Sequence, residues 1–155
     1  METIEVPDVK IEPGQLVFEA DARFTEIVDY GVSMEEAMSG KLPPATGIRF
    51  DLGFEGTGTG LIESTISGVG YLYVRADGVQ ETHTHAQAIT KDGARIAAYQ
   101  TGTVSVDESG NMREVFQIRL HSNFERYEWV NGLALRGEGT VDMGTGTMQN
   151  RVYAA

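Results

Sequence analysis

The segment from Gly68 to Gly102 constrains the fold of this chain more than any other. It reads GVGYLYVRADGVQETHTHAQAITKDGARIAAYQTG. Polar and apolar residues alternate along it, which is typical of β-strands. Ala-Asp-Gly at 76–78 and Lys-Asp-Gly at 91–93 interrupt the alternation, and Asp-Gly is a strong signal for a hairpin turn. The segment therefore predicts three consecutive antiparallel strands joined by two short turns.

The length of each turn decides which side chains share a face, because strand side chains alternate with period two. A two-residue loop would place Tyr71 on one face with Thr82 and Thr84. A three-residue loop, a type I turn followed by a left-handed glycine, would place Tyr71 with His83 instead and would set His85 opposite Tyr99. We favour the three-residue loop, since Asp followed by Gly suits its second and third positions.

Three-residue loops divide the segment into two faces. One carries polar and aromatic side chains: Tyr71, Tyr73, Arg75, Glu81, His83, His85, Gln87, Arg95, Tyr99 and Thr101. The other carries small or apolar side chains: Leu72, Val74, Thr82, Thr84, Ala86, Ala88, Ile96 and Ala98. The polar-aromatic face meets solvent if the apolar face covers a core, and it lines a cavity if the protein encloses a ligand. The pattern leaves these two alternatives open.

Further alternating segments predict strands at 16–25, 48–54, 61–67, 103–107 and 112–121, and one or two short strands within 140–153. In the segment 112–121, one side carries Met112, Glu114, Phe116, Ile118 and Leu120. Glycines at 56, 58 and 60 predict a bend or bulge rather than a phosphate loop, because a further strand follows them where a phosphate loop needs a helix.

A short helix is predicted from Met34 to about Met38. Ser33 followed three residues later by Glu36 is a capping box, and Gly40 ends the helix. About eight to ten strands with one short helix predict an all-β protein with a single antiparallel β-barrel, since closure removes exposed strand edges. We expect an N-terminal arm over residues 1–14 and one barrel domain over residues 15–155.

Composition excludes several classes of partner and chemistry. The chain has 155 residues with 23 acidic and 12 basic side chains, a formal net charge of −11, which disfavours binding to nucleic acid or to anionic membranes. Cysteine is absent from the sequence, which excludes disulfides and thiolate chemistry. No apolar run approaches the roughly 20 residues of a membrane span, and METIEVPDVK lacks the features of a signal peptide. We therefore expect a cytoplasmic protein.

Several of these motifs resemble domain-of-unknown-function family 3237. They are GVGYLYVRADG at 68–78, TKDGARI at 90–96, Gly102, Phe124 and YEWVN at 127–131. The similarity covers roughly residues 45–155, and Val130 stands where the family usually has leucine. The resemblance implies a small antiparallel barrel of the lipocalin or streptavidin kind, with no established activity. It also implies that Arg75, Trp129 and Asn131 match recurring family positions.

The polar-aromatic face supplies the candidate chemistry. Histidine transfers protons readily near neutral pH, so we predict catalytic roles for His83, His85, Arg75 and Glu81. Ligand-binding roles are predicted for Tyr71, Tyr73, Tyr99, Trp129 and Asn131. The alternatives are a salt bridge between Arg75 and Glu81, barrel-end packing for Trp129, and a turn at Asn131-Gly132.

A metal site is the less favoured interpretation of the histidines. His83 and His85 share a strand face, and His121 or Glu81 is available as a third ligand. Barrel metalloproteins of this kind, the cupins, need a further glutamate and a second histidine motif, which the sequence lacks. We expect neither a metal nor a cofactor.

Three functions remain open. The first is a barrel that holds a small aromatic or carbonyl compound, acting as a cofactor-free lyase, isomerase or cyclase. The second is a non-catalytic ligand-binding barrel. The third is a solidly packed barrel that serves dimerisation, so a homo-oligomer stays open as well. A cavity of roughly 300 Å³ or more, lined by Tyr71, Arg75, His83 and His85, would exclude the third.

Overall fold

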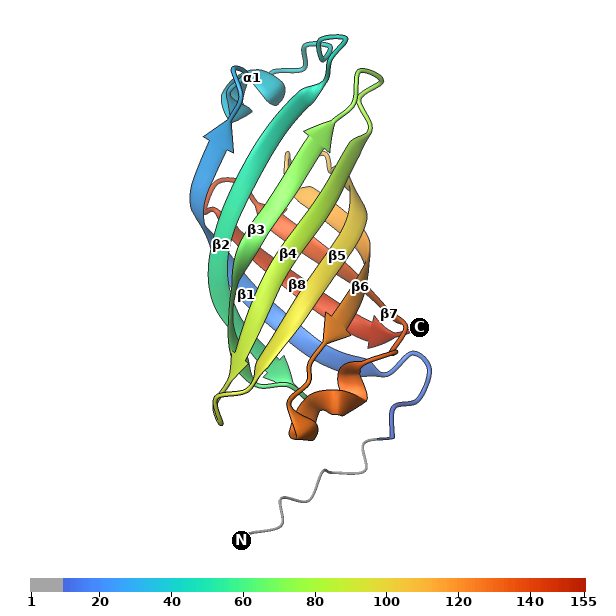
Figure 1. The fold of residues 1–155 in the computed structure, drawn as a ribbon. Coiled ribbons are helices and arrows are strands. Elements are labelled where there is room, and N and C mark those ends of the chain that lie inside the picture. Colours follow the sequence, from blue (N-terminus) through green and yellow to red (C-terminus); the bar gives the residue numbers. More distant parts are fainter. Residues whose placement is uncertain (1–9) are drawn as a thin grey trace, which may run out of the picture.

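The computed structural model describes residues 10–155, which form a closed antiparallel barrel of eight strands in sequential order (Figure 1). The strands are β1 (Leu16–Asp29), β2 (Ile48–Gly60), β3 (Ser64–Val74), β4 (Gln80–Thr90), β5 (Arg95–Val106), β6 (Met112–His121), β7 (Leu135–Asp142) and β8 (Thr147–Ala154). β1 pairs with β8 and closes the sheet on itself. The predicted all-β barrel is confirmed. Residues 1–9 of the predicted N-terminal arm lie outside the described part of the chain.

Both turns of the central segment are three-residue loops, as predicted. Arg75 N donates to Val79 O at 2.8 Å and Gly78 N donates to Arg75 O at 2.9 Å. Gly78 and Gly93 have φ values of 88° and 85°, the left-handed conformation that glycine adopts without strain. Tyr71 consequently pairs with His83, and His85 with Tyr99. Local turn chemistry therefore sets the register of β3, β4 and β5.

Two short helices occur in the described chain, where the sequence predicted one. The predicted helix is α1 (Met34–Ala37), capped by Ser33 Oγ, which accepts from Glu36 N at 3.1 Å. The second is a 3₁₀ helix, η1 (Glu125–Val130), which falls within the late family-like motif. α1 and η1 lie at opposite ends of the barrel (Figure 1).

Interior glycines allow neighbouring strands to approach closely while the sheet coils. A Cβ at Gly56 would lie 1.9 Å from Asp21 O, and one at Gly68 would lie 2.3 Å from His85 O. No side chain fits at such distances, so glycine is required at both positions. The glycine-rich stretch is thus the last part of β2, in regular pairing with β3, whereas the sequence predicted that the strand ended at Phe54 and that a bend or bulge followed.

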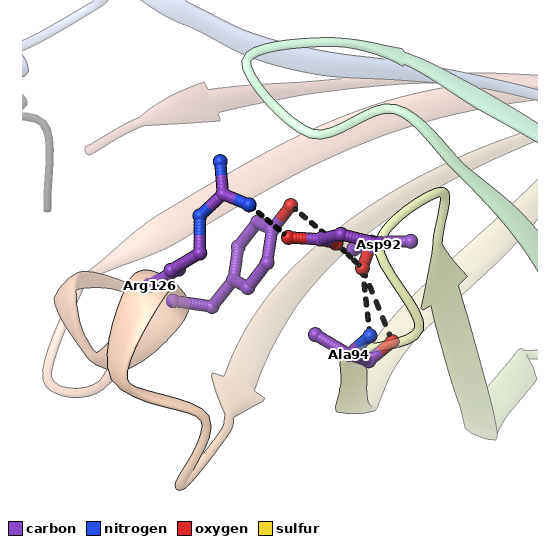
Figure 2. A network of polar contacts seen from close by, with 5 residues as sticks. Asp92, Ala94 and Arg126 are labelled. Atoms are coloured by element: carbon purple, nitrogen blue, oxygen red, sulfur yellow. Dashed lines mark hydrogen bonds and ion pairs between the residues drawn. The ribbon is translucent and has the colours of Figure 1, made fainter. Parts of the chain in front are cut away.

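The end of the barrel near η1 is closed by the larger of two hydrophobic clusters. Its fully buried members include Val17, Ile96, Val130 and Val152. Asp92, in the β4–β5 turn, connects this end to η1 (Figure 2): it pairs with Arg126 Nη1 at 2.6 Å and accepts from Tyr127 Oη at 3.2 Å. The 3₁₀ helix is therefore fixed as a plug over the barrel.

The end near α1 contains the smaller cluster, formed by buried Ile48, Phe50 and Leu72. Met34 and Ala37 of α1 pack against it while remaining partly exposed. Within residues 10–155, no helix is long and apolar enough to cross a bilayer.

Candidate functional site

The apolar face of β3, β4 and β5 points into the barrel, and the polar-aromatic face points outward. Leu72 and Ile96 are 3% and 1% exposed, whereas Tyr71 and Tyr99 are 37% and 41% exposed. The alternative in which the polar-aromatic face lines a cavity is therefore wrong. The physical reason is that the barrel closes on itself. Its interior offers few polar partners, so the face with fewer polar groups is the one that is buried.

The two histidines form an exposed cluster with tyrosines on the outer surface. His85 lies edge-on to Tyr99 with ring centroids 4.9 Å apart, and to Tyr71 at 6.2 Å. His83 Nδ1 lies 3.3 Å from Tyr99 Oη. The predicted catalytic and binding residues His83, His85, Tyr71 and Tyr99 thus contact one another, but they are separated from the interior by the barrel wall.

The other predicted residues of this face have structural partners. Arg75 forms salt bridges to Glu81 at 3.2 Å and to Asp77 at 2.8 Å, which is the salt-bridge alternative raised from the sequence. Tyr73 Oη donates to Thr46 O at 3.3 Å. These contacts support the β3–β4 hairpin and the entry to β2.

Trp129 and Asn131 belong to the plug at the η1 end. Trp129 packs against the larger hydrophobic cluster, as its barrel-end alternative predicted. Asn131 Oδ1 accepts from Ser122 N at 3.0 Å, and Asn131 Nδ2 donates to Ser122 O at 2.7 Å. The amide therefore ties η1 to the end of β6. Across residues 10–155, no group of three or more His, Asp or Glu side chains is arranged to hold a metal ion.

The barrel interior contains an apolar cavity of about 120 Å³. None of the predicted site residues lines it. Aliphatic, aromatic and methionine side chains from all parts of the wall predominate, among them Phe24, Leu52, Phe54, Ile66 and Met148. The cavity is smaller than the roughly 300 Å³ at the lower end of typical drug-sized pockets. It is closer to apolar cavities of about 150 Å³, which hold benzene.

Glu114, on β6, is the one charged side chain among the described residues that line this cavity. Its Oε1 accepts from Thr82 Oγ1 at 2.7 Å and from Gln100 Nε2 at 3.0 Å. No residue within 10–155 donates a hydrogen bond to its other oxygen, Oε2. The carboxyl is thus held by one oxygen, while the other oxygen has no protein partner.

Gly102 of β5 provides the room for this arrangement. A Cβ at position 102 would lie 2.5 Å from Val115 O, 2.8 Å from Phe116 Cβ and 3.1 Å from Glu114 Oε1. The Glu114 carboxyl therefore packs directly over Gly102, and the absence of a side chain there lets it reach Thr82 and Gln100. Any side chain at 102 would displace both the backbone of β6 and the carboxyl.

Burial among apolar groups raises the pKa of Glu114 above its ordinary value of 4.5. The hydrogen bonds from Thr82 and Gln100 act in the opposite direction, because they stabilise the carboxylate, and they offset part of the effect. Glu114 consequently keeps its proton to a higher pH than an exposed glutamate. Carboxyls with such raised pKa values are typical of acid–base sites.

Asn150 of β8 lies on the other side of Glu114 along the barrel wall. Glu114 pairs with Gly139 on β7, and Gly139 pairs with Asn150. Asn150 Oδ1 occupies the space that a Cβ at Gly139 would need, 1.9 Å away. Asn150 also lines the cavity, and its amide forms no side-chain hydrogen bond within the described residues.

Sequence reasoning missed Glu114 although it placed the residue on the correct side of its strand. The signal was a single carboxylate among Met112, Phe116, Ile118 and Leu120. A lone acid on an apolar strand face costs free energy unless it is partnered, so its presence indicates a specific role. The histidines indicated acid–base chemistry by residue type alone, and the sequence pattern did not show that they lie on the outer face.

Solved structures of low sequence identity share this fold. A beta-barrel-like protein from Acinetobacter baumannii AYE is 16% identical with a TM-score of 0.72, covering 94% of this chain and 98% of that protein. A conserved protein of unknown function from Rhodopseudomonas palustris is 16% identical with a TM-score of 0.68, covering 93% and 99%. An enzyme from Penicillium herquei is 18% identical with a TM-score of 0.57, covering 94% and 98%.

No family model and no curated protein matches the chain. At these identities, the structural neighbours establish the barrel fold alone.

Proposed function

We propose that the barrel binds a small, uncharged and largely apolar molecule in its interior. The observation that carries this proposal is the apolar cavity with a single carboxyl, Glu114, held by one oxygen and unpartnered at the other. Apolar walls with a few convergent polar groups are the usual composition of ligand sites. An anionic ligand is disfavoured, because Glu114 and the net charge of −11 repel it.

The size of the cavity restricts the ligand to about one ring. A volume of about 120 Å³ is comparable to that of cavities that admit benzene. Four methionines, Met34, Met112, Met143 and Met148, line the cavity, and their flexible side chains can adapt to the shape of a guest.

Acid–base turnover of this ligand is the finer part of the proposal. A cofactor-free isomerase, lyase or cyclase needs a group that transfers protons to or from the ligand, and Glu114 replaces His83 and His85 in that role. The structurally similar protein from Penicillium herquei is described as an enzyme, which is compatible with catalysis in this fold. A carrier without catalysis is the second candidate, favoured by the small polar content of the cavity.

Family membership and context are also proposals. The motifs at 68–78, 90–96 and 127–131 support membership of domain-of-unknown-function family 3237. A cytoplasmic location and a homo-oligomer stay predictions from the sequence.

A matched pair of substitutions on neighbouring residues tests ligand binding. Ala98 lines the cavity, whereas Ala97 is exposed on the outer face. Saturation-transfer NMR with benzene and cyclohex-2-en-1-one should detect binding to the wild type and to Ala97→Leu. Ala98→Leu should lose at least about ten-fold in affinity, because the added side chain fills the cavity. Equal binding by the two variants, or none by the wild type, would refute an interior ligand site.

A further inference from the structure

Glu114 is the one titratable group among the described residues that line the cavity. The other described residues that line it are apolar, glycine, or neutral polar residues such as Ser64, Thr84 and Asn150. Thr82 and Gln100, which contact the carboxyl from β4 and β5, are neutral as well. The cavity wall therefore supplies only one of the two groups that a reaction with a separate protein acid and protein base would use.

This restriction selects a class of reaction. Hydrolysis and elimination are fastest with two protein groups, one that removes a proton and one that protonates the leaving group. A proton shift within a single ligand needs only one group, which takes the proton at one carbon and returns it at another. Of the lyase, isomerase and cyclase chemistries considered above, isomerisation makes the smallest demand on the protein, since a lone carboxyl can complete it.

We propose that Glu114 is the catalytic base and acid of a proton shift on a small, uncharged, unsaturated ketone or related carbonyl compound bound in the cavity. This inference rests on the proposed function, since it requires that the ligand occupies the interior. It adds the substrate class and the residue that performs the reaction.

The proposed step balances without an added reactant. Glu114 Oε2, as carboxylate, removes a proton from the carbon between the carbonyl and the carbon–carbon double bond. The C–H electron pair forms a new carbon–carbon double bond, and the carbonyl π pair moves to oxygen, giving a dienolate. The neutral Glu114 then returns the same proton to the far carbon of the original double bond. The carbonyl re-forms, and the double bond is now conjugated with it.

The hydrogen bonds of Glu114 determine which oxygen transfers the proton. Oε1 uses its lone pairs to accept from Thr82 and Gln100. The proton of the neutral acid is therefore carried by Oε2, the oxygen without a protein partner. Burial, which raises the pKa of Glu114, also makes its carboxylate a stronger base.

In this proposal, Asn150 stabilises the enolate oxygen. Its amide lines the cavity one strand beyond Gly139, and none of its hydrogen-bonding capacity is used by the side chains of residues 10–155. A neutral amide N–H stabilises a developing oxyanion without competing for the proton. Glu114 and Asn150 thus lie on the same cross-strand row of the cavity wall, on either side of Gly139.

The test uses cyclohex-3-en-1-one, a single-ring ketone whose isomerisation to cyclohex-2-en-1-one is followed by ultraviolet absorbance and by NMR. The wild type should accelerate the conversion. Glu114→Gln should lose at least about 100-fold, because the amide keeps the acceptor for Thr82 and Gln100 but transfers no proton. Glu138→Gln makes the same change on the outer surface and should retain the wild-type rate. Asn150→Leu should lower kcat while leaving the pH midpoint of the rate unchanged.

Positioning by Thr82 has its own readout. The rate should rise with pH as Glu114 loses its proton, and Thr82→Val should move the midpoint to higher pH, since it removes a donor that lowers the pKa of Glu114. Binding of the ketone without acceleration by the wild type, or full activity of a folded Glu114→Gln variant, would overturn this inference and leave interior binding intact. Absence of binding by NMR would instead overturn the proposed function.

Discussion

The outer face of β3, β4 and β5 carries many exposed polar and aromatic groups, whereas the inner face carries a few buried polar groups. The outer face carries Tyr71, His83, His85 and Tyr99, whose rings contact one another at the surface. The inner face has few polar side chains, yet it provides Thr82 and Gln100 to hold the buried carboxyl of Glu114. Water competes for every polar group on the outer face, whereas a polar group inside interacts at low dielectric. The inner face, although it has fewer polar groups, is therefore the one suited to acid–base chemistry.

The largest loss of stability is expected for a substitution at Gly102, which lies against the inner-face carboxyl of Glu114. Gly102→Ala should lower the free energy of unfolding by about 1–3 kcal/mol, because its Cβ would lie 2.5 Å from Val115 O. Gly70→Ala is the control, since its Cβ would meet Thr84 Oγ1 at 3.4 Å, an ordinary contact. Urea denaturation measures both variants. Equal stability of the two would contradict the role assigned to Gly102.

The next effect concerns the buried charge of Glu114. Its raised pKa means that the folded protein holds the proton more tightly than the unfolded chain, so the contribution of Glu114 to stability is greatest below pH 4.5 and decreases as pH rises through the raised value. Glu114→Gln should therefore become increasingly more stable than the wild type above pH 4.5. The difference grows by about 1.4 kcal/mol for each pH unit between the two pKa values. Denaturation curves from pH 4 to pH 8 provide the test, and a constant difference would contradict it.

Asp92 provides a contrasting carboxyl, outside the cavity. The hydrogen bond from Thr90 holds the pKa of Asp92 below its ordinary value of 3.8, assisted by Tyr127 and Arg126. Its stabilising contribution is therefore present above pH 3.8 and is lost as pH falls through the lowered value. Asp92→Asn should cost about 0.5–1.5 kcal/mol at pH 7. It should also increase hydrogen exchange in η1, and unchanged exchange there would show that Asp92 does not fix the plug.

The smallest effect is expected for the histidines. The double variant His83→Ala, His85→Ala removes exposed ring contacts and the exposed contact of His83 with Tyr99 Oη, so it should change stability by less than about 1 kcal/mol. Binding of benzene or cyclohex-2-en-1-one should be unchanged, because neither residue lines the cavity. A loss of binding comparable to that of Ala98→Leu would place the ligand on the outer face after all.

The sequence was sufficient for the parts of the fold that depend on local chemistry. Asp-Gly in each turn specified a three-residue loop, and that loop fixed the pairing of Tyr71 with His83 and of His85 with Tyr99. The serine cap of α1 was likewise visible as a short-range motif. These features need no knowledge of distant strands.

The direction of each face was not accessible in the same way, because it depends on closure between β1 and β8. The partners of Glu114 come from β4 and β5, at positions 32 and 14 residues away along the chain. Only the register of the closed barrel brings them together. The usable sequence signals were one acid on an apolar strand face and a glycine, Gly102, opposite Phe116 on the neighbouring strand.

The most direct test of the interior site compares the two faces in one NMR experiment. The side-chain carboxyl carbon of Glu114 and the ring carbons of His83 and His85 are observed in ¹³C-labelled protein while cyclohex-2-en-1-one is added. Binding inside the barrel should shift the Glu114 signal and displace its titration midpoint, while the histidine signals stay in place. Shifts at the histidines with an unchanged Glu114 signal would contradict the account.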